Sequence, residues 1–317
     1  MKKRTVVSAV LFVLFIFGSA ITGSTQRAPI TGDLRIEFTP RDTDQVQLTM
    51  TRGRQHNWGN GIKISEVQGL SRDYATAAAN VTLRIVRDAG TFELTGSFRD
   101  GQGSGRFTLT PDESFFSALA ARGYTNLTED QVFSAAISGM KISSIDELKG
   151  AGYDHPTFDN LIEATLFKIT AASIADLRDA GFDHLPFNKL VEASIFKVDS
   201  NFVREVQGMG FSNLQFQKLI ELRVHKITPD YLNEIRQLGF SDLPLDKVVE
   251  LKIFKVTPEF VNEIRAAGFA SVTPQELVNL RIFKIDSDYA RRARSQDPNI
   301  TVEKMVEQRI FEKRSGQ

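Results

Sequence analysis

The chain has 317 residues, of which 41% are hydrophobic and 25% are charged, a balance typical of a globular protein long enough for two domains. Lys and Arg together number 39, as do Asp and Glu, so the formal net charge is zero and the basic footprint of a nucleic-acid binder is excluded. The sequence contains no Cys, which excludes disulfides, thiolate catalysis and cysteine-based zinc sites.

The N-terminus is typical of a bacterial export signal. Three basic residues, Lys2 to Arg4, precede an almost entirely apolar run from Val6 to Phe17, and Gly18 to Ala20 are small. This order predicts a signal peptide over residues 1–26 and a periplasmic or extracellular chain. The alternative is an uncleaved helix that anchors the chain to the inner membrane, in which case this segment alone would contact the membrane. We favour cleavage, because the run is shorter than the roughly 20 residues that a spanning helix needs.

Residues 27–109 are predicted to form a small antiparallel β domain. Apolar and polar residues alternate over 34–40, 46–52 and 80–98, and Asp100-Gly101 is a strong hairpin signal between two such runs. We expect five to seven strands in a small sandwich or a curled sheet.

Residues 53–64, GRQHNWGNGIKI, are the least regular part of this domain. His56 and Trp58 lie there among glycines, and Trp58 is the single Trp of the chain. One interpretation is a ligand loop in which Trp58 is a stacking platform. The other, which we favour, is a long hairpin whose Trp closes one end of the sheet.

The rest of the chain is built on a 29-residue repeat. A Gly followed by an aromatic residue recurs at this fixed interval, at Gly123, Gly152, Gly181, Gly210, Gly239 and Gly268. A seventh, degenerate unit begins at Lys284 and is one residue short. A fixed period between about 20 and 50 residues predicts a stacked-repeat architecture.

Each unit reads as helix–turn–helix. In the fifth unit Thr228 suits an N-cap, Pro229 suits the first helical position, and Gly239 suits a left-handed C-terminal position. Lys255 is expected in the last turn of the second helix, where a cation favours the helix dipole. The apolar face of that second helix is expected to consist of Leu245, Val248, Val249 and Ile253.

Such short helices are marginal in isolation, and stacking would bury their apolar faces in a continuous core. The sequence therefore predicts an α+β protein with two domains. The β domain precedes an α-solenoid of about seven helix–turn–helix repeats over residues 110–317.

Stacked repeats turn equivalent positions into columns. Phe precedes Lys in four units, and His225 takes the place of Phe in the middle unit. The functional interpretation is a stripe that binds an extended acidic or apolar partner, and the structural one is helix capping by Lys and packing by Phe. The first helices carry an acidic column, Glu147, Asp176, Glu205, Glu234 and Glu263, and an Arg column, Arg178, Arg236, Arg265 and Arg294. The candidate partner-binding residues are Lys168, Lys197, Lys226, Lys255, Lys284 and His225.

Signals for catalysis and cofactors are missing from the sequence. We find no zinc-protease, nucleophile-elbow, phosphate-loop or dinucleotide motif. His155 and His184 share a repeat position, but neighbouring helices lie about 8–10 Å apart, which is too far for one ion. We therefore expect no enzyme activity, no cofactor and no metal.

Units such as LPLDKVVELKIFKVTPEFVNEIRAAGF (243–269) resemble helical repeats of exported or membrane-associated bacterial proteins. They are similar to the C-terminal repeat extensions of bla-regulator/Mec-type membrane sensor metallopeptidases. The resemblance covers residues 110–311 and implies an envelope-associated, sensory or regulatory binding module. It does not imply protease activity, because the His-Glu-x-x-His signature and the multi-span membrane domain are missing from this sequence.

Two functions follow as hypotheses. The first is a non-enzymatic interaction module of the bacterial envelope, whose solenoid surface binds a protein or peptide partner. The alternative is that the β domain binds a small molecule or an envelope polymer, while the solenoid is a spacer or an output arm.

Overall fold

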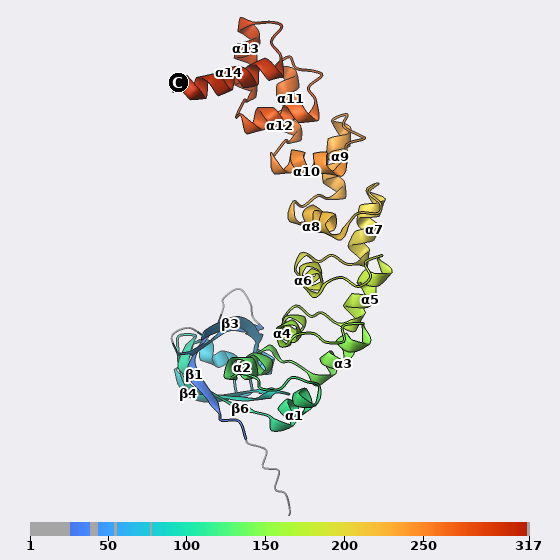
Figure 1. Cartoon of the computed structure of the whole chain (residues 1–317). Coiled ribbons are helices and arrows are strands. Elements are labelled where there is room, and N and C mark those ends of the chain that lie inside the picture. Colours follow the sequence, from blue (N-terminus) through green and yellow to red (C-terminus); the bar gives the residue numbers. More distant parts are fainter. Residues whose placement is uncertain (1–25, 39–43, 54–55, 77, 316–317) are drawn as a thin grey trace, which may run out of the picture. The chain divides into compact units, whose positions relative to one another are not determined.

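The computed structural model describes residues 26–38, 44–53, 56–76 and 78–315 (Figure 1). The chain is an α+β protein in which a β part precedes a helical part. It divides into two compact units, Met1–Ile137 and Ser138–Gln317, here called the sheet unit and the helical unit. The predicted change from strands to helices at residue 110 lies within the sheet unit, which also holds the first two helices. The predicted signal peptide lies almost wholly outside the described residues.

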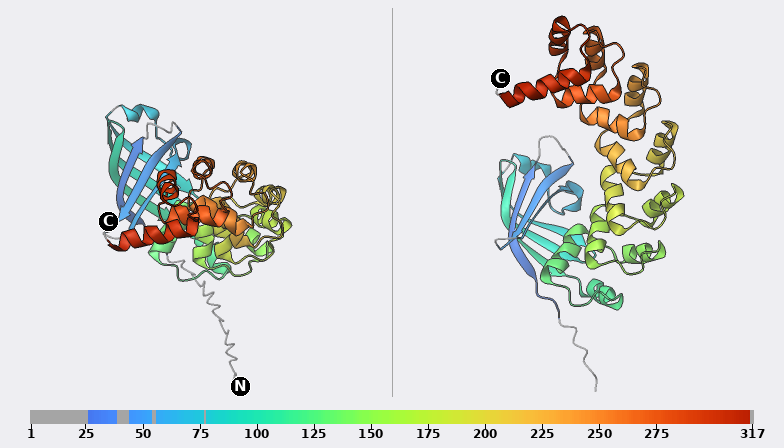
Figure 2. Two further views of the ribbon diagram at one scale, coloured as in Figure 1. Left: turned by 90° about the horizontal axis from the view of Figure 1, so that it is seen from above. Right: turned by 45° about the horizontal axis from the view of Figure 1, so that its top comes forward.

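The described strands of the sheet unit form one curved antiparallel sheet (Figure 2). Their order is β3-β2-β1-β6-β5-β4. This confirms the predicted antiparallel β part, as a single sheet and not as a sandwich. The strands are β1 (Ile30–Phe38), β2 (Gln45–Arg52), β3 (His56–Lys63), β4 (Ala79–Arg87), β5 (Gly90–Arg99) and β6 (Gln102–Pro111). Two short 3-10 helices, η1 (Ile64–Glu66) and η2 (Arg72–Ala75), lie between β3 and β4.

The core of the sheet unit lies on one face of this sheet. Alternation along the strands turns apolar side chains to that face, where Leu34 pairs with Met50 and Phe107 pairs with Leu94. Helix α1 (Glu113–Ala121) follows the last strand, and α2 (Glu129–Ser138) packs its Phe133 on the same face. The Phe133 ring centroid lies 5.8 Å from that of Phe92 and 5.7 Å from that of Phe107. Aromatic packing therefore joins α2 to the sheet.

The helices of the helical unit begin at regular intervals, equal to the period of the sequence repeat. This holds for the odd-numbered helices from α3 to α13 and for the even-numbered helices from α4 to α12. The odd-numbered helices are α3 (Ile142–Gly150), α5 (Ala171–Asp179), α7 (Ser200–Gly208), α9 (Pro229–Gln237), α11 (Pro258–Ala266) and α13 (Ser287–Gln296). The even-numbered helices are α4 (Phe158–Leu166), α6 (Phe187–Phe196), α8 (Phe216–Val224), α10 (Leu245–Ile253), α12 (Pro274–Ile282) and α14 (Val302–Ser315).

The helices of the helical unit lie in two rows (Figure 1). In the odd row α3 packs against α5 and α5 against α7, and α11 packs against α13. In the even row α4 packs against α6, α6 against α8, α10 against α12 and α12 against α14. Each of these helices thus contacts the equivalent helix of the next unit, and equivalent residues lie beside one another.

The predicted helix signals in the fifth unit are confirmed. The Thr228 side chain accepts a hydrogen bond from the Tyr231 N–H, and Pro229 occupies the first helical position of α9. Gly239 has a φ of +86°, in the left-handed region that favours glycine. The Phe240 N–H then donates to the Ile235 carbonyl at 3.3 Å, which closes the end of the helix.

Two expectations for the second helix of this unit are corrected. Lys255 does not lie in the last turn, because α10 ends at Ile253 and Lys255 follows it in the left-handed conformation with a φ of +54°. Ile253 does not belong to the buried face, since it is 48% exposed while Leu251 is fully buried. At 100° per residue the buried stripe of α10 passes through Leu251, and Ile253 is turned away from it.

Candidate functional site

The clearest surface feature of the helical unit is a row of exposed aliphatic side chains. They occupy equivalent positions of consecutive repeats, at or next to the last residue of each even-numbered helix from α4 to α12. Their exposed fractions lie between 43% and 50%, in helices whose other large aliphatic side chains are mostly buried. The aliphatic column consists of Leu166, Ile195, Val224, Ile253 and Ile282.

A lysine follows each aliphatic residue by two positions. All five lysines, called here the lysine column, are exposed and have φ between 52° and 56°. After α10 the Lys255 N–H donates to the Lys252 carbonyl at 3.1 Å, and the Val256 N–H donates to the Leu251 carbonyl at 2.9 Å. This pairing is the Schellman end of a helix, and it places Lys255 where glycine is usual. The lysine column consists of Lys168, Lys197, Lys226, Lys255 and Lys284.

The choice of lysine is not explained by the backbone. The odd-numbered helices α3 to α11 are each followed by a glycine with positive φ, for example Gly210 and Gly239. Gly139, one period before Lys168, also has a positive φ, of 75°. A left-handed conformation costs a residue with a side chain roughly 1–2 kcal/mol. Glycine would avoid this cost at all five positions, so backbone conformation alone does not select lysine there.

The residues on either side of each aliphatic residue are tied to the fold. Before Val224, Ile253 and Ile282 the preceding side chain reaches an aromatic ring of the odd row, whereas Thr165 and Ser194 donate to backbone carbonyls. Arg223 lies 3.7 Å from the ring centroid of Phe202, and Arg281 lies 3.8 Å from that of Phe260. The following position is half-buried, and His225 there has the same intermediate burial as its four counterparts, Phe167, Phe196, Phe254 and Phe283. The packing interpretation of the Phe column therefore agrees with its burial, and the exposed positions are the aliphatic residue and the lysine.

The even row carries two groups of lysines, which differ in whether their ammonium groups form ion pairs. Within the described chain, no ion pair or hydrogen bond engages the ammonium of any member of the lysine column. A second row of lysines on the even helices is paired: Lys218 lies 2.9 Å from Glu221 and 2.7 Å from Asp246 of the next unit. The hydrogen bonds with Asp246 and Glu221 raise the pKa of Lys218. The paired row is charge-compensated, whereas the lysine column adds five positive charges that have no ion-pair partner among the described residues.

The arginines of the odd row join consecutive units. Arg236 Nη2 donates to the Met209 carbonyl at 2.8 Å, and Arg265 Nη2 donates to the Leu238 carbonyl at 2.7 Å. Both carbonyls lie at the end of the preceding odd helix, where no intrahelical donor is left for them. Arg178 makes the same bond to Ala151 at 3.1 Å. These arginines therefore have a structural role.

The acidic column of the odd row is partly structural too. Asp176 accepts hydrogen bonds from the Ser200 N–H at 2.8 Å and from its hydroxyl at 2.5 Å. These bonds hold the pKa of Asp176 below its ordinary value. Asp176 thus caps the first turn of α7, the odd helix of the next unit.

The other candidate residues lie elsewhere. His56 and Trp58 belong to strand β3, at one edge of the sheet, and not to a loop. Trp58 is half-buried opposite Met50, on the inner face. A shallow hollow of about 640 Å³ lies on the outer face of the sheet, lined by Arg35, Thr49 and Asn57 among others. In the part of the chain that the structure describes, no group of three or more His, Asp or Glu side chains could hold a metal ion.

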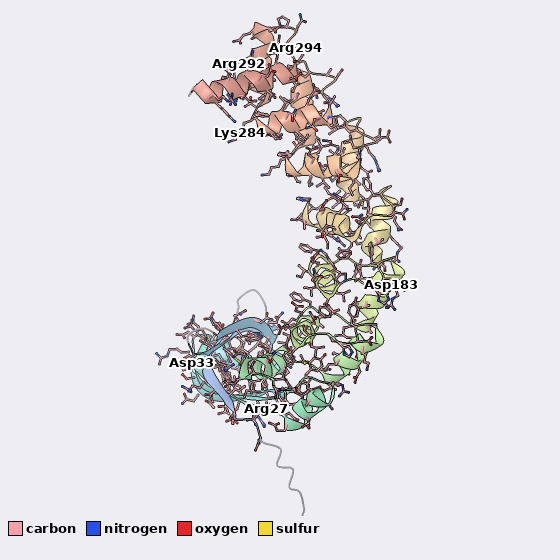
Figure 3. The ribbon with its side chains drawn as sticks, in the orientation of Figure 1. Arg27, Asp33, Asp183, Lys284, Arg292 and Arg294 are labelled. Atoms are coloured by element: carbon pink, nitrogen blue, oxygen red, sulfur yellow. The ribbon has the colours of Figure 1, made fainter. Side chains whose placement is uncertain are left out.

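Figure 3 shows Asp183 and Lys284 on the sides of different helix rows. Asp183 follows α5 on the side of the odd row, where Arg178 Nε donates to it at 2.8 Å. Lys284 follows α12 on the side of the even row (Figure 3). The candidate surface, made of the aliphatic and lysine columns, thus belongs to one row of helices.

The sequence reasoning found the lysine column but missed the aliphatic column beside it. A signal was present, because each lysine ends a triplet of aliphatic, Phe or His, and Lys: LFK, IFK, VHK, IFK and IFK. Of the five aliphatic members, Ile253 alone was placed on a buried face, because it continues the apolar spacing of its own helix. Only the placement of the neighbouring units shows that it stays exposed.

Comparisons with known proteins found no matching family model and no matching curated protein. Among the described residues there is also no helix with the length and apolar character needed to cross a bilayer.

Proposed function

We propose that this protein is a non-enzymatic interaction module of the bacterial envelope, and that the even row of its helical unit binds a protein or peptide partner. In this proposal the helical unit is an α-solenoid of helix pairs from α3–α4 to α13–α14, and the α1–α2 pair of the sheet unit shows the same 29-residue spacing along the chain, which gives the seven repeats of the sequence. The regular helix starts and the packing of equivalent helices support this architecture. A role in sensing or regulation is what the resemblance of residues 110–311 implies, and it forms part of this proposal.

The observation that carries the proposal is the pair of exposed columns. Five aliphatic side chains, each about half exposed, line up with five lysines that have no ion-pair partner among the described residues. Covering the exposed half of one such aliphatic side chain would contribute on the order of 1 kcal/mol to binding. Apolar side chains gathered along one edge mark interaction surfaces in soluble proteins.

The proposal is tested by affinity capture from an envelope extract with the intact chain. The test variant carries Lys197→Glu, Lys226→Glu and Lys255→Glu. The control variant carries Lys141→Glu, Lys149→Glu and Lys304→Glu, three exposed lysines outside the column, so that the net charge changes by the same amount and in the same direction. We expect a partner that the wild type and the control retain and the test variant loses.

Two outcomes would contradict the proposal. Equal retention by all three proteins would show that the even row is not the binding surface. Loss of a retained partner on substitution of Arg35 and Asn57 on the outer face of the sheet, with no effect of the lysine changes, would instead support binding by the sheet unit. Circular dichroism on each variant checks that helical content is unchanged.

A further inference from the structure

We infer that the two columns bind an acidic peptide in an extended conformation, with an apolar side chain at every third residue. This inference rests on the proposed function, because it names the chemistry of the partner that the even row would bind. The spacing of the aliphatic column predicts the conformation of the peptide, and the lysine column beside it predicts the acidic charge of the peptide.

The spacing of the column matches an extended chain. In the even row α4 packs against α6, α6 against α8 and α10 against α12, and packed helices lie roughly 8–10 Å apart. A polyproline II chain rises about 3.1 Å per residue, so three residues span roughly 9.3 Å and return to the same face. An extended peptide that lies across the ends of the even helices therefore presents one side chain to each aliphatic residue.

A helical partner fits the same column poorly. At about 1.5 Å per residue, a helix advances roughly six residues between neighbouring units. Six residues are not a whole number of 3.6-residue turns, so an apolar stripe would rotate away from the column after one or two contacts. The spacing therefore favours an extended segment over a helix.

The charge of the column selects an acidic sequence. Two residues after each aliphatic residue lies a lysine whose ammonium has no ion-pair partner among the described residues. A second copy of this chain laid on the column would bring lysines toward lysines, which is unfavourable. Carboxylates placed between the apolar residues of a peptide would instead meet one lysine in each unit.

A flat anionic membrane is a poorer match than a peptide. The paired row places Glu192 three residues before Ile195 and Glu250 three residues before Ile253, on the same face of their helices. Lys189 and Lys247 compensate these carboxylates, so the face carries separated positive charges at the lysine column and not the continuous positive surface that a flat anionic membrane favours. The five aliphatic side chains are also only about half exposed. The column contains no Trp, a residue that commonly inserts at membrane interfaces.

The length of the ligand follows from the number of units. Five contacts at three-residue intervals need roughly 13 residues of extended chain. A suitable probe is therefore the peptide (Leu-Pro-Glu)4-Leu, which combines the apolar period, acidic charge and a bias toward polyproline II. Its controls are a peptide of the same composition without the three-residue period, and a peptide with Lys in place of Glu.

The experiment is fluorescence anisotropy of each labelled peptide with the intact chain. We expect the period-matched acidic peptide to bind at least about tenfold more tightly than either control, since apolar contacts and several ion pairs add together. Lys197→Gln with Lys226→Gln and Lys255→Gln should weaken binding at least about fivefold and reduce its dependence on salt. The control variant, Lys141→Gln with Lys149→Gln and Lys304→Gln, removes three exposed lysines outside the column and should bind as the wild type does.

Equal affinity for the matched and the unmatched peptide would overturn the inference, as would equal loss of binding in the two lysine variants. Binding of mixed phosphatidylcholine and phosphatidylserine vesicles, lost in the column variant while no peptide binds, would also overturn it in favour of an anionic membrane. If the peptides fail but an envelope partner is still captured through the lysine column, the proposed function stands and only the extended acidic ligand is rejected.

Discussion

At the scale of single residues, the backbone conformation at helix ends separates structural positions from candidate functional ones. The odd helices α3 to α11 are closed by glycine at positive φ, and the even helices α4 to α12 are closed by lysine at positive φ. The two solutions close the helix with the same Schellman pairing. The two kinds of helix end differ in the side chain that is exposed to solvent. Substitutions of the glycine and of the lysine should therefore change the free energy of unfolding differently.

The first prediction concerns Gly239, where an added Cβ would meet no atom within 4 Å, so that only the backbone conformation is at stake. Gly239→Ala should lower the free energy of unfolding by roughly 1–2 kcal/mol, because alanine is strained at a φ of +86°. The matched control is Gly208→Ala, which also has open space but lies within helix α7. It should raise stability by about 0.4–1 kcal/mol in urea unfolding. Equal effects of the two substitutions would refute the assignment of a left-handed position.

The second prediction concerns Lys255. Lys255→Gly relieves the left-handed strain and should leave the free energy of unfolding unchanged or raise it by up to about 1 kcal/mol. The control Lys252→Gly lies inside α10, with its ammonium 4.0 Å from the Tyr231 ring centroid, and should lower stability by about 1 kcal/mol or more. Chemical unfolding of both variants checks this. A clear loss of stability in Lys255→Gly would show that the lysine column is structural.

At the scale of elements, the joints between consecutive units are polar as well as apolar. Arginines of the odd row bond to free carbonyls of the preceding helix, and Asp176 caps the helix of the following unit. Because these bonds connect equivalent positions of adjacent units, they fix the register of the stack.

The third prediction tests the arginine bonds. Arg265→Ala removes the 2.7 Å bond to the Leu238 carbonyl and the contact of its guanidinium with the Phe240 ring, 5.4 Å away. We expect a loss of about 1–3 kcal/mol in the free energy of unfolding. Arg204→Ala, whose guanidinium bonds to Asn201 of its own helix, should change stability by less than about 0.5 kcal/mol. Thermal and urea unfolding of both proteins measure the difference, and similar losses would contradict the joint assigned to Arg265.

The fourth prediction concerns pH and Asp176. Hydrogen bonds from Ser200 lower the pKa of this carboxyl below its unfolded value of 3.8. A depressed folded pKa contributes stability that is present above the unfolded value and is lost as pH falls through the folded value. Asp176→Asn should therefore lower stability at neutral pH and make the remaining stability less sensitive to acid below pH 3.8. The control is Asp179→Asn on the same helix. Parallel acid-unfolding curves for wild type and Asp176→Asn would contradict this role.

At the scale of the whole molecule, the sequence predicted the order of the parts better than it predicted the surface. Alternation and the Asp100-Gly101 turn were sufficient for an antiparallel sheet, and N-cap residues such as Thr228 marked helix starts correctly. The position of Gly239 at the end of a predicted helix also correctly indicated its left-handed backbone conformation. These signals are local, because each depends on the preferences of a few neighbouring residues.

The missed features depend on contacts between units. The spacing within α10 is compatible with a buried stripe through either Leu251 or Ile253, and in the structure only Leu251 is buried. The conformation of Lys255 depends on which residue ends α10, and helix ends are the least certain part of a prediction from pattern. For His56 and Trp58 the loop interpretation is wrong, whereas the favoured hairpin agrees with the antiparallel pairing of β3 with β2. The aliphatic column therefore becomes visible only when the repeats are placed beside one another.

The most direct test of the central claim is site-specific photo-crosslinking in intact cells. A photoreactive residue is placed in turn at Ile195, Val224 and Ile253 of the aliphatic column, and at Asn233 and Asn262 of the odd row as controls. We predict a crosslinked partner from the three column positions and none from the two controls. Crosslinks from Asn233 and Asn262 but not from the column, or none from any of the five positions, would contradict the assignment of the even row as the binding surface.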